Sequence, residues 1–168
     1  SADGSSDAVI SPQGPASASC RRIGAYNNNI WIAHGGVRIN WGAQYNVDGF
    51  SGFVNDEWVR ISSDTTYSAG AGFNATSSFV TDIMDIAVDP DDNSIIYAAT
   101  WDDGLVKVNT TTGRLQPLNG TATTGPDESD ADPSATRTPV AAVEFDENGV
   151  LWCTNSFTDR AIHALDRG

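Results

Sequence analysis

Histidine has the widest range of chemistry of any side chain near neutral pH, and this chain contains two histidines. His34 directly follows an apolar run ending at Ala33, a position from which it could bind a ligand or act as a general base. No carboxylate or second histidine stands at a diagnostic spacing from it, because His163 belongs to a different apolar segment. We therefore expect His34 to be a hydrogen-bonded or solvent-facing side chain and not a catalytic one.

Aspartate oxygens are concentrated in two short segments. Asp89, Asp91 and Asp92 stand at the tight spacing that calcium prefers, but their segment lacks the glycine and distal glutamate of an EF-hand loop. It also separates two apolar runs, where a hairpin turn is required, so we interpret it as a turn. We interpret residues 127–132 as an acidic loop. We expect no cofactor. Calcium is the one ion that these aspartate oxygens would suit.

Cys20 and Cys153 fall in apolar positions of different, non-adjacent sequence repeats. A meander of strands would hold their α-carbons beyond the reach of a disulfide. We expect two free, buried thiols that act as small hydrophobic side chains.

The charge of the chain excludes two classes of partner. The 22 acidic residues outnumber the 9 basic ones, and the net charge is -13. Such a charge repels the phosphates of nucleic acids and the headgroups of anionic membranes. The sequence also has no apolar run of about 18 residues, so we expect no insertion into a membrane.

An internal repeat organises the sequence. Residues 20–33, 83–99 and 140–154 each contain an apolar strand, a polar turn and a second apolar strand with an aromatic residue, Trp31, Tyr97 or Trp152. The turns carry the Asn, Asp, Gly and Pro that hairpins require. A second hairpin follows over residues 52–61 and 104–118. Each repeat is therefore predicted to be a four-stranded antiparallel meander with its aromatic residue in the core.

These repeats predict an all-β fold, a β-propeller fragment of about three four-stranded antiparallel blades with the last one incomplete. The blades occupy residues 20–62, 81–118 and 139–168, and residues 1–19 are expected to form a flexible tail. An immunoglobulin-like sandwich would not show such a repeat. Because a closed ring needs about four blades or more, we expect the remaining blades to come from a longer chain or another subunit.

Loop lengths predict the face that binds a ligand. In a four-stranded meander, the connections after the second and fourth strands emerge on one face, and the long segments 34–49, 62–80 and 119–138 all follow those strands. Long loops on a rigid scaffold are where binding usually resides. The candidate ligand-binding residues on this long-loop face carry aromatic, carboxylate, amide or imidazole groups: His34, Trp41, Tyr45, Asp48, Trp101, Asp102, Asp103 and Asn155.

Several motifs resemble a known family. Residues 85–90 (Asp-Ile-Ala-Val-Asp-Pro), 96–100 (Ile-Tyr-Ala-Ala-Thr), 104–109 (Gly-Leu-Val-Lys-Val-Asn) and 146–152 (Asp-Glu-Asn-Gly-Val-Leu-Trp) are similar to two-component regulator propeller repeats. Residues 46–58 look like the equivalent stretch of the propeller component of the bacterial type IX secretion system. The resemblance implies a propeller at the cell surface, outside the cell or in the periplasm, which senses glycans or holds parts of a secretion machine.

We therefore expect a non-enzymatic binding or scaffolding propeller of the cell envelope that takes a protein or glycan ligand on the long-loop face. One alternative is a calcium-dependent propeller lyase or hydrolase that uses His34 with Asp102 and Asp103. A structural subunit of a surface assembly is a second alternative.

Overall fold

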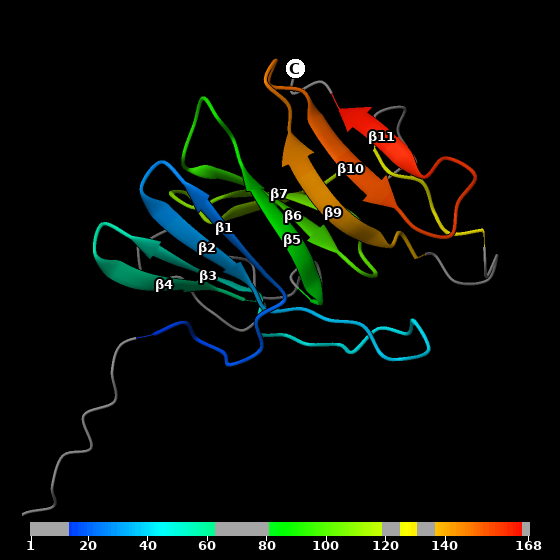
Figure 1. Ribbon diagram of the computed structural model, residues 1–168, viewed down its shortest axis with the longest axis horizontal. Coiled ribbons are helices and arrows are strands. Elements are labelled where there is room, and N and C mark those ends of the chain that lie inside the picture. The colour runs from blue at the N-terminus through cyan, green and yellow to red at the C-terminus, as the bar shows by residue number, and fades with distance from the viewer. Residues whose placement is uncertain (1–13, 63–80, 119–124, 131–136, 166–168) are drawn as a thin grey trace, which may run out of the picture.

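The computed structural model describes residues 14–62, 81–118, 125–130 and 137–165, and these residues form three antiparallel sheets (Figure 1). The first sheet contains β1 (Arg22–Tyr26), β2 (Asn29–Ala33), β3 (Phe50–Val54) and β4 (Glu57–Ile61). The second contains β5 (Ile83–Val88), β6 (Ile95–Thr100), β7 (Leu105–Asn109) and β8 (Arg114–Pro117). The third contains β9 (Val140–Phe145), β10 (Leu151–Asn155) and β11 (Ile162–Leu165).

The tight turns follow from their asparagine and aspartate residues. In the first sheet Tyr26 pairs with Asn29, and Val54 pairs with Glu57, which leaves two residues for each turn. All four turn residues have positive φ: 48° at Asn27, 62° at Asn28, 52° at Asn55 and 64° at Asp56. Asparagine and aspartate tolerate this left-handed conformation better than other side chains that have a Cβ, so they favour two-residue hairpin turns.

The sheets lie side by side in chain order, as the blades of a propeller do (Figure 1). Each is a meander in which every strand pairs with the next one along the chain. The first strands join the sheets, because β5 packs against β1 and β2, and β9 packs against β5 and β6. The predicted propeller class is therefore confirmed, and the third sheet has three strands in the described part of the chain.

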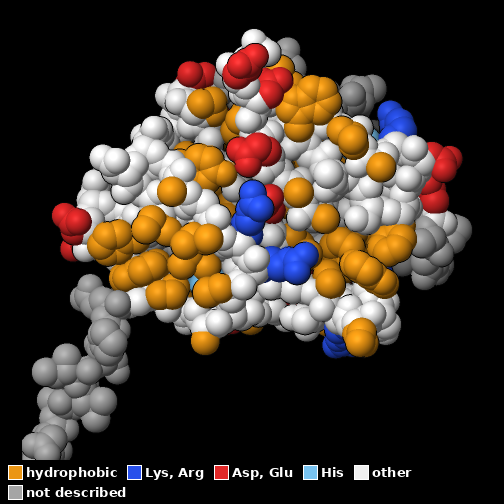
Figure 2. Space-filling view, viewed as in Figure 1, with side chains coloured by type: hydrophobic (Ala, Val, Ile, Leu, Met, Phe, Trp, Pro, Cys, Tyr) orange, Lys and Arg blue, Asp and Glu red, His pale blue; other side chains and the backbone are white. Residues whose placement is uncertain are grey.

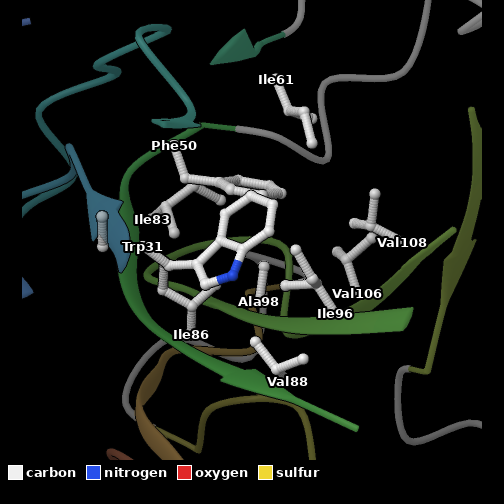
Figure 3. Close-up of a cluster of buried hydrophobic side chains, with 11 residues drawn as sticks. Trp31, Phe50, Ile61, Ile83, Ile86, Val88, Ile96, Ala98, Val106 and Val108 are labelled. Carbon is white, nitrogen blue, oxygen red and sulfur yellow. The ribbon is translucent and has the colours of Figure 1, made fainter. Parts of the chain in front are cut away.

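A first hydrophobic core fills the space between the first two sheets (Figure 3). The Trp31 indole lies at its centre and is 2% exposed, and its ring centroid lies 6.0 Å from that of Phe50. Side chains of β5, β6 and β7 cover these rings from the second sheet. The predicted core position of Trp31 is correct.

A second core joins the second and third sheets through Tyr97, which packs edge-on against Phe145 at 5.5 Å between ring centroids. Trp152 was expected in a core and is instead 43% exposed. It occupies the strand position that matches Trp31 and Tyr97, but that face of the third sheet has no neighbouring sheet among the described residues. Its indole N–H donates to the Asp146 carboxylate at 2.9 Å.

The two cysteines differ in burial, and both are free. Cys153 is buried in the second core, and burial raises the pKa of its thiol to about 12. The prediction that Cys20 is buried is wrong: Cys20 is exposed, because it precedes β1, which begins at Arg22. No helix in the described ranges is long and apolar enough to cross a membrane.

The chain that leads into the first sheet is held to that sheet by hydrogen bonds. The Ala16 N–H donates to Ser51 Oγ at 3.1 Å, and the Ser17 hydroxyl donates to the Asp48 carboxylate at 2.6 Å. These contacts lie within residues 14–19 of the segment expected to be a flexible tail, and residues 1–13 lie outside the described part of the chain.

Candidate ligand-binding surface

The connections after β2, β6 and β10 emerge on one face of the molecule, as the strand directions require. They are residues 34–49, 101–104 and 156–161, and each belongs to a different sheet. Most of the connections after β4 and β8 lie outside the described residues. The opposite face carries the shorter hairpin turns. The described part of the long-loop face thus contains one complete loop of each blade, together with the described residues of the connections after β4 and β8.

Asp82 fixes the longest of these loops to the second sheet. Its carboxylate accepts the backbone N–H groups of Tyr45 at 2.8 Å and Asn46 at 2.9 Å, and its own N–H donates to the Asn46 carbonyl at 2.8 Å. Asp82 is 1% exposed, so these bonds are shielded from water. No local sequence pattern indicates this role, because Asp82 stands more than 30 positions from its partners.

Three aromatic rings from three blades meet on this face, and we call Trp41, Trp101 and Phe157 the aromatic platform. Trp101 is 2% exposed, and its indole N–H donates to the Trp41 carbonyl at 2.8 Å. Its ring centroid lies 6.3 Å from that of Trp41 and 6.0 Å from that of Phe157. Trp41 is 61% exposed and Phe157 is 45% exposed. Trp101 therefore supports two rings that face solvent.

Tyr45 extends the exposed aromatic surface along the same loop. It is 66% exposed, and the guanidinium of Arg38 lies 5.8 Å from the centroid of its ring. This distance suits a cation–π interaction. The loop thus places a hydrogen-bond donor beside an exposed ring.

The backbone at the exposed aromatic residues has an unusual conformation. The φ angle is 64° at Trp41, 58° at Tyr45 and 62° at Phe157. Every other non-glycine residue with positive φ in the described ranges is an asparagine or aspartate. A bulky side chain is a true outlier in the left-handed region, at a cost of roughly 1–3 kcal/mol each. The surrounding hydrogen bonds hold these residues in place.

His34 lies beneath this face. It is 0% exposed, and its Nδ1 lies 2.6 Å from the Ser19 carbonyl oxygen and its Nε2 lies 2.7 Å from Ser51 Oγ. Both ring nitrogens therefore have hydrogen-bond partners, and His34 is hydrogen-bonded, as expected. The arrangement joins the entering chain to the first sheet and leaves no ring atom open to a ligand.

Asp48 and Asn155 also make contacts within the chain. The Asp48 carboxylate accepts the Ser17 hydroxyl and lies 3.7 Å from the Arg60 guanidinium. Asn155 is 2% exposed, and its Nδ2 donates to the Asp127 carbonyl at 2.8 Å. These two residues shape the loops and do not join the exposed aromatic surface.

Asp102 and Asp103 connect the second sheet to the segment that enters the third. Asp102 forms an ion pair with Arg137, and the Thr138 N–H donates to its carbonyl at 2.9 Å. Asp103 accepts the Thr81 hydroxyl at 3.1 Å. Burial raises the pKa of Asp103, and the carboxylates of Asp102 and Asp82 raise it further, although the Thr81 hydroxyl opposes them.

The aspartate segment after β5 forms a turn, as predicted. The Asp89 carboxylate accepts the Asp91 N–H at 3.0 Å, and the Asp92 carboxylate accepts the Ser94 N–H at 2.9 Å. Bonds of this kind stabilise tight turns. Within the described part of the chain, no group of three or more His, Cys, Asp or Glu side chains is placed to hold a metal ion.

Of the eight residues predicted from sequence, the structure thus brings Trp41 and Trp101 together, and it places Tyr45 exposed on the same loop as Trp41. Phe157 completes the aromatic platform and was missed. Its only sequence signal is that it follows β10 in the connection equivalent to those that carry Trp41 and Trp101.

The fold and its loops define a segment of a β-propeller, and comparisons with solved structures agree with this class. PorZ, a bacterial surface component of the type IX secretion system of Porphyromonas gingivalis, is similar at a TM-score of 0.70 and 23% identity. The match covers 94% of this chain and 20% of PorZ, so the chain spans about a fifth of the length of that protein.

The extracellular domain of a putative hybrid two-component system from B. thetaiotaomicron is also similar, at a TM-score of 0.46 and 14% identity over 79% of this chain and 15% of that one. PorZ is of the kind that residues 46–58 resemble. No family model matches the chain, and no curated protein matches it.

Proposed function

We propose that this chain is a non-enzymatic binding module of the bacterial cell envelope, and that its long-loop face binds a saccharide chain. The observation that carries the proposal is the exposure of Trp41, Tyr45 and Phe157 on left-handed backbone. Residues in strained conformations cluster at functional sites, because the rest of the structure has to hold them there.

The chemistry of the surface suits a sugar ring. Trp41 and Phe157 offer flat apolar area at low entropic cost, and the Arg38 guanidinium offers polar groups beside the exposed ring of Tyr45. Rings supported from below by the buried Trp101 are preorganised, which reduces the entropy lost when a ligand binds.

The residues required by the enzymatic alternative are engaged in the structure of the chain. His34 is fully buried with both ring nitrogens bonded, and Asp102 forms an ion pair with Arg137. A general base must reach the proton that it removes. These contacts favour binding over catalysis.

The likeness to PorZ, described as a bacterial surface component of the type IX secretion system, supports a location at the cell envelope and a role in secretion. Because that likeness extends to the fold alone, this part of the proposal depends on finding the ligand.

The test is a glycan array probed with the 168-residue chain and with Trp41→Ala and Phe157→Ala variants. We expect each substitution to weaken binding at least about tenfold, as loss of an aromatic anchor does, with little change in Tm. Trp152→Ala is the matched control, because Trp152 is also an exposed tryptophan but lies on the third sheet, away from the loops. The proposal fails if neither Trp41→Ala nor Phe157→Ala changes glycan binding, or if a protein is bound through these rings in place of glycans.

A further inference from the structure

A second segment packs against the loop that carries Phe157. Residues 125–130 lie beside this loop, and the Asp130 N–H donates to the Phe157 carbonyl at 2.8 Å. The Asp159 N–H in turn donates to the Asp130 carboxylate at 3.2 Å. The side chains of Asp130 and Asp159 are both exposed. The aromatic platform therefore has an exposed polar border beside Phe157.

Two contacts of Asp127 fix this border to the third sheet. The Asp127 carbonyl accepts a hydrogen bond at 2.8 Å from Nδ2 of Asn155, which is 2% exposed. The Asp127 carboxylate accepts a hydrogen bond from Nε of Arg160 at 2.8 Å and also contacts its Nη2, so the two charges are paired. The border is thus held in one arrangement before a ligand binds, which reduces the entropic cost of binding.

The border carries negative charge. Residues 125–130 and 156–161 contain one basic residue, Arg160, and four acidic residues: Asp127, Glu128, Asp130 and Asp159. Arg160 is paired with Asp127. In the part of the chain that the structure describes, no cation lies within ion-pair distance of the other three acidic residues. A ligand that rests on Phe157 therefore meets carboxylates that no cation neutralises.

The loop of the first blade carries a cation beside its exposed ring. The Arg38 guanidinium lies 5.8 Å from the centroid of the Tyr45 ring, and among the described residues no carboxylate lies within ion-pair distance of it. A guanidinium only donates hydrogen bonds and a carboxylate only accepts them, whereas a sugar hydroxyl does both. Uncharged hydroxyl groups can therefore bond to Arg38 and to the border, but an acidic group on the ligand would be repelled by the border.

We propose that the aromatic platform selects saccharides without acidic groups, and that Asp130 and Asp159 are the residues that select them. This inference rests on the proposed function and extends its site by these two residues. Their carboxylates accept hydrogen bonds from the hydroxyl groups of a sugar ring that lies on Phe157, and bonds to a charged acceptor are about twice as strong as neutral ones. The same carboxylates repel the carboxylate or sulfate groups of an acidic saccharide, and such like-charge contacts exclude wrong partners.

The experiment uses pairs of oligosaccharides that differ only in the oxidation of a hydroxymethyl group to a carboxylate, glucose against glucuronate and mannose against mannuronate. Binding of the 168-residue chain to each member is measured on an array over a series of protein concentrations, at low and at high salt. The neutral member should bind at least about tenfold more tightly, because the acidic member places like charges together. The preference should shrink at high salt, because salt screens the repulsion between exposed charges.

Asp130→Asn combined with Asp159→Asn should remove most of the preference by strengthening the binding of the acidic member. Asp92→Asn is the matched control, because Asp92 is also an exposed aspartate but lies in the turn between β5 and β6, on the opposite face, and its substitution should leave the preference intact.

Equal binding of both members by the parent chain would overturn the inference. An equal loss of both members in the double variant would also overturn it, since that result assigns the two aspartates to loop structure alone. In either case, weaker binding by Phe157→Ala would leave the proposed function standing. If no glycan binds, the proposed function and this inference fail together.

Discussion

Asp85 lies where the first strands of the three sheets meet. Its carboxylate accepts the N–H groups of Ile86 at 3.0 Å and of Val143, on β9, at 3.2 Å, and lies 3.3 Å from Nε of Arg22 on β1. The residue is 5% exposed. Acidic and basic side chains lie together at the centre of the view in Figure 2, over these first strands. One carboxylate thus contacts all three blades.

The shifted pKa of Asp85 makes the free energy of unfolding depend on pH. Burial raises the pKa of Asp85 above its ordinary value of 3.8, and the N–H groups of Val143 and Ile86 and the charge of Arg22 oppose the rise. The folded chain therefore holds this proton more tightly than the unfolded chain does. Its contribution to the unfolding free energy falls as the pH rises from 3.8 through the folded-state pKa. Asp85→Asn removes this dependence.

We expect Tm to fall less between about pH 4 and about pH 6 in Asp85→Asn than in the parent chain, measured by thermal unfolding. Asp92→Asn is a control whose effect lies in a different pH range. The Ser94 hydroxyl and N–H lower the pKa of Asp92, so its contribution is complete above the ordinary value of 3.8 and is lost as the pH falls below that value; the substitution should therefore leave the slope of Tm above about pH 4 nearly unchanged. Equal slopes in the parent and Asp85→Asn would contradict the role given to Asp85.

At the scale of the strands, the position of an aromatic residue in its blade does not by itself decide its contribution to stability. Trp31 is buried by the next blade, whereas Trp152 at the matching position is 43% exposed. We expect Trp31→Ala to lower the free energy of unfolding by about 3–5 kcal/mol, as for a buried aromatic residue. Trp152→Ala should cost roughly 1–2 kcal/mol, from partial burial and the bond to Asp146. Urea unfolding measures both, and equal losses would contradict this account.

The hairpins were predictable because their signals are local. Asn27 and Asn28 mark a turn by their own conformational preference, and the strands around them are apolar and β-branched. The exposure of Trp152 and the anchoring by Asp82 depend on neighbours far along the chain, which a local pattern does not contain. Cys20 lay too close to the start of a strand for the pattern to place it inside or outside. Of the aromatic residues on the long-loop face, Trp41, Tyr45 and Trp101 were predicted as candidates, and Phe157 was missed.

At the scale of the whole molecule, both outer faces of the set of blades carry exposed apolar side chains. Ile23 is 65% exposed and Ile30 is 37% exposed on the first sheet, and Ile162 is 66% exposed beside Trp152 on the third. Hydrophobic side chains gather over the first sheet in Figure 2. The residues that match Ile23 and Ile30 in the other two sheets pack between blades, Ile86 and Ile96 in the first core and Val143 and Leu151 in the second. These faces suit further blades or subunits.

We expect the 168-residue chain to associate in solution, because these faces remain uncovered in a single copy. Light scattering over a range of concentrations measures this. Ile23→Glu and Ile162→Glu should each reduce the association, whereas Ile39→Glu, at an exposed loop position, should not. A compact monomer at all concentrations, with strong amide protection in β11, would contradict the expectation.

The aromatic platform takes one ring from each blade, and this links ligand binding to the spacing of the blades. Trp41, Trp101 and Phe157 keep their mutual distances only while the three sheets keep their packing. A ligand that rests on all of the exposed rings therefore favours the closed arrangement of blades over any arrangement in which they separate. By thermodynamic linkage, the same ligand raises the stability of the whole fold as its concentration exceeds its dissociation constant. Separation of the blades and release of the ligand are then two aspects of a single equilibrium.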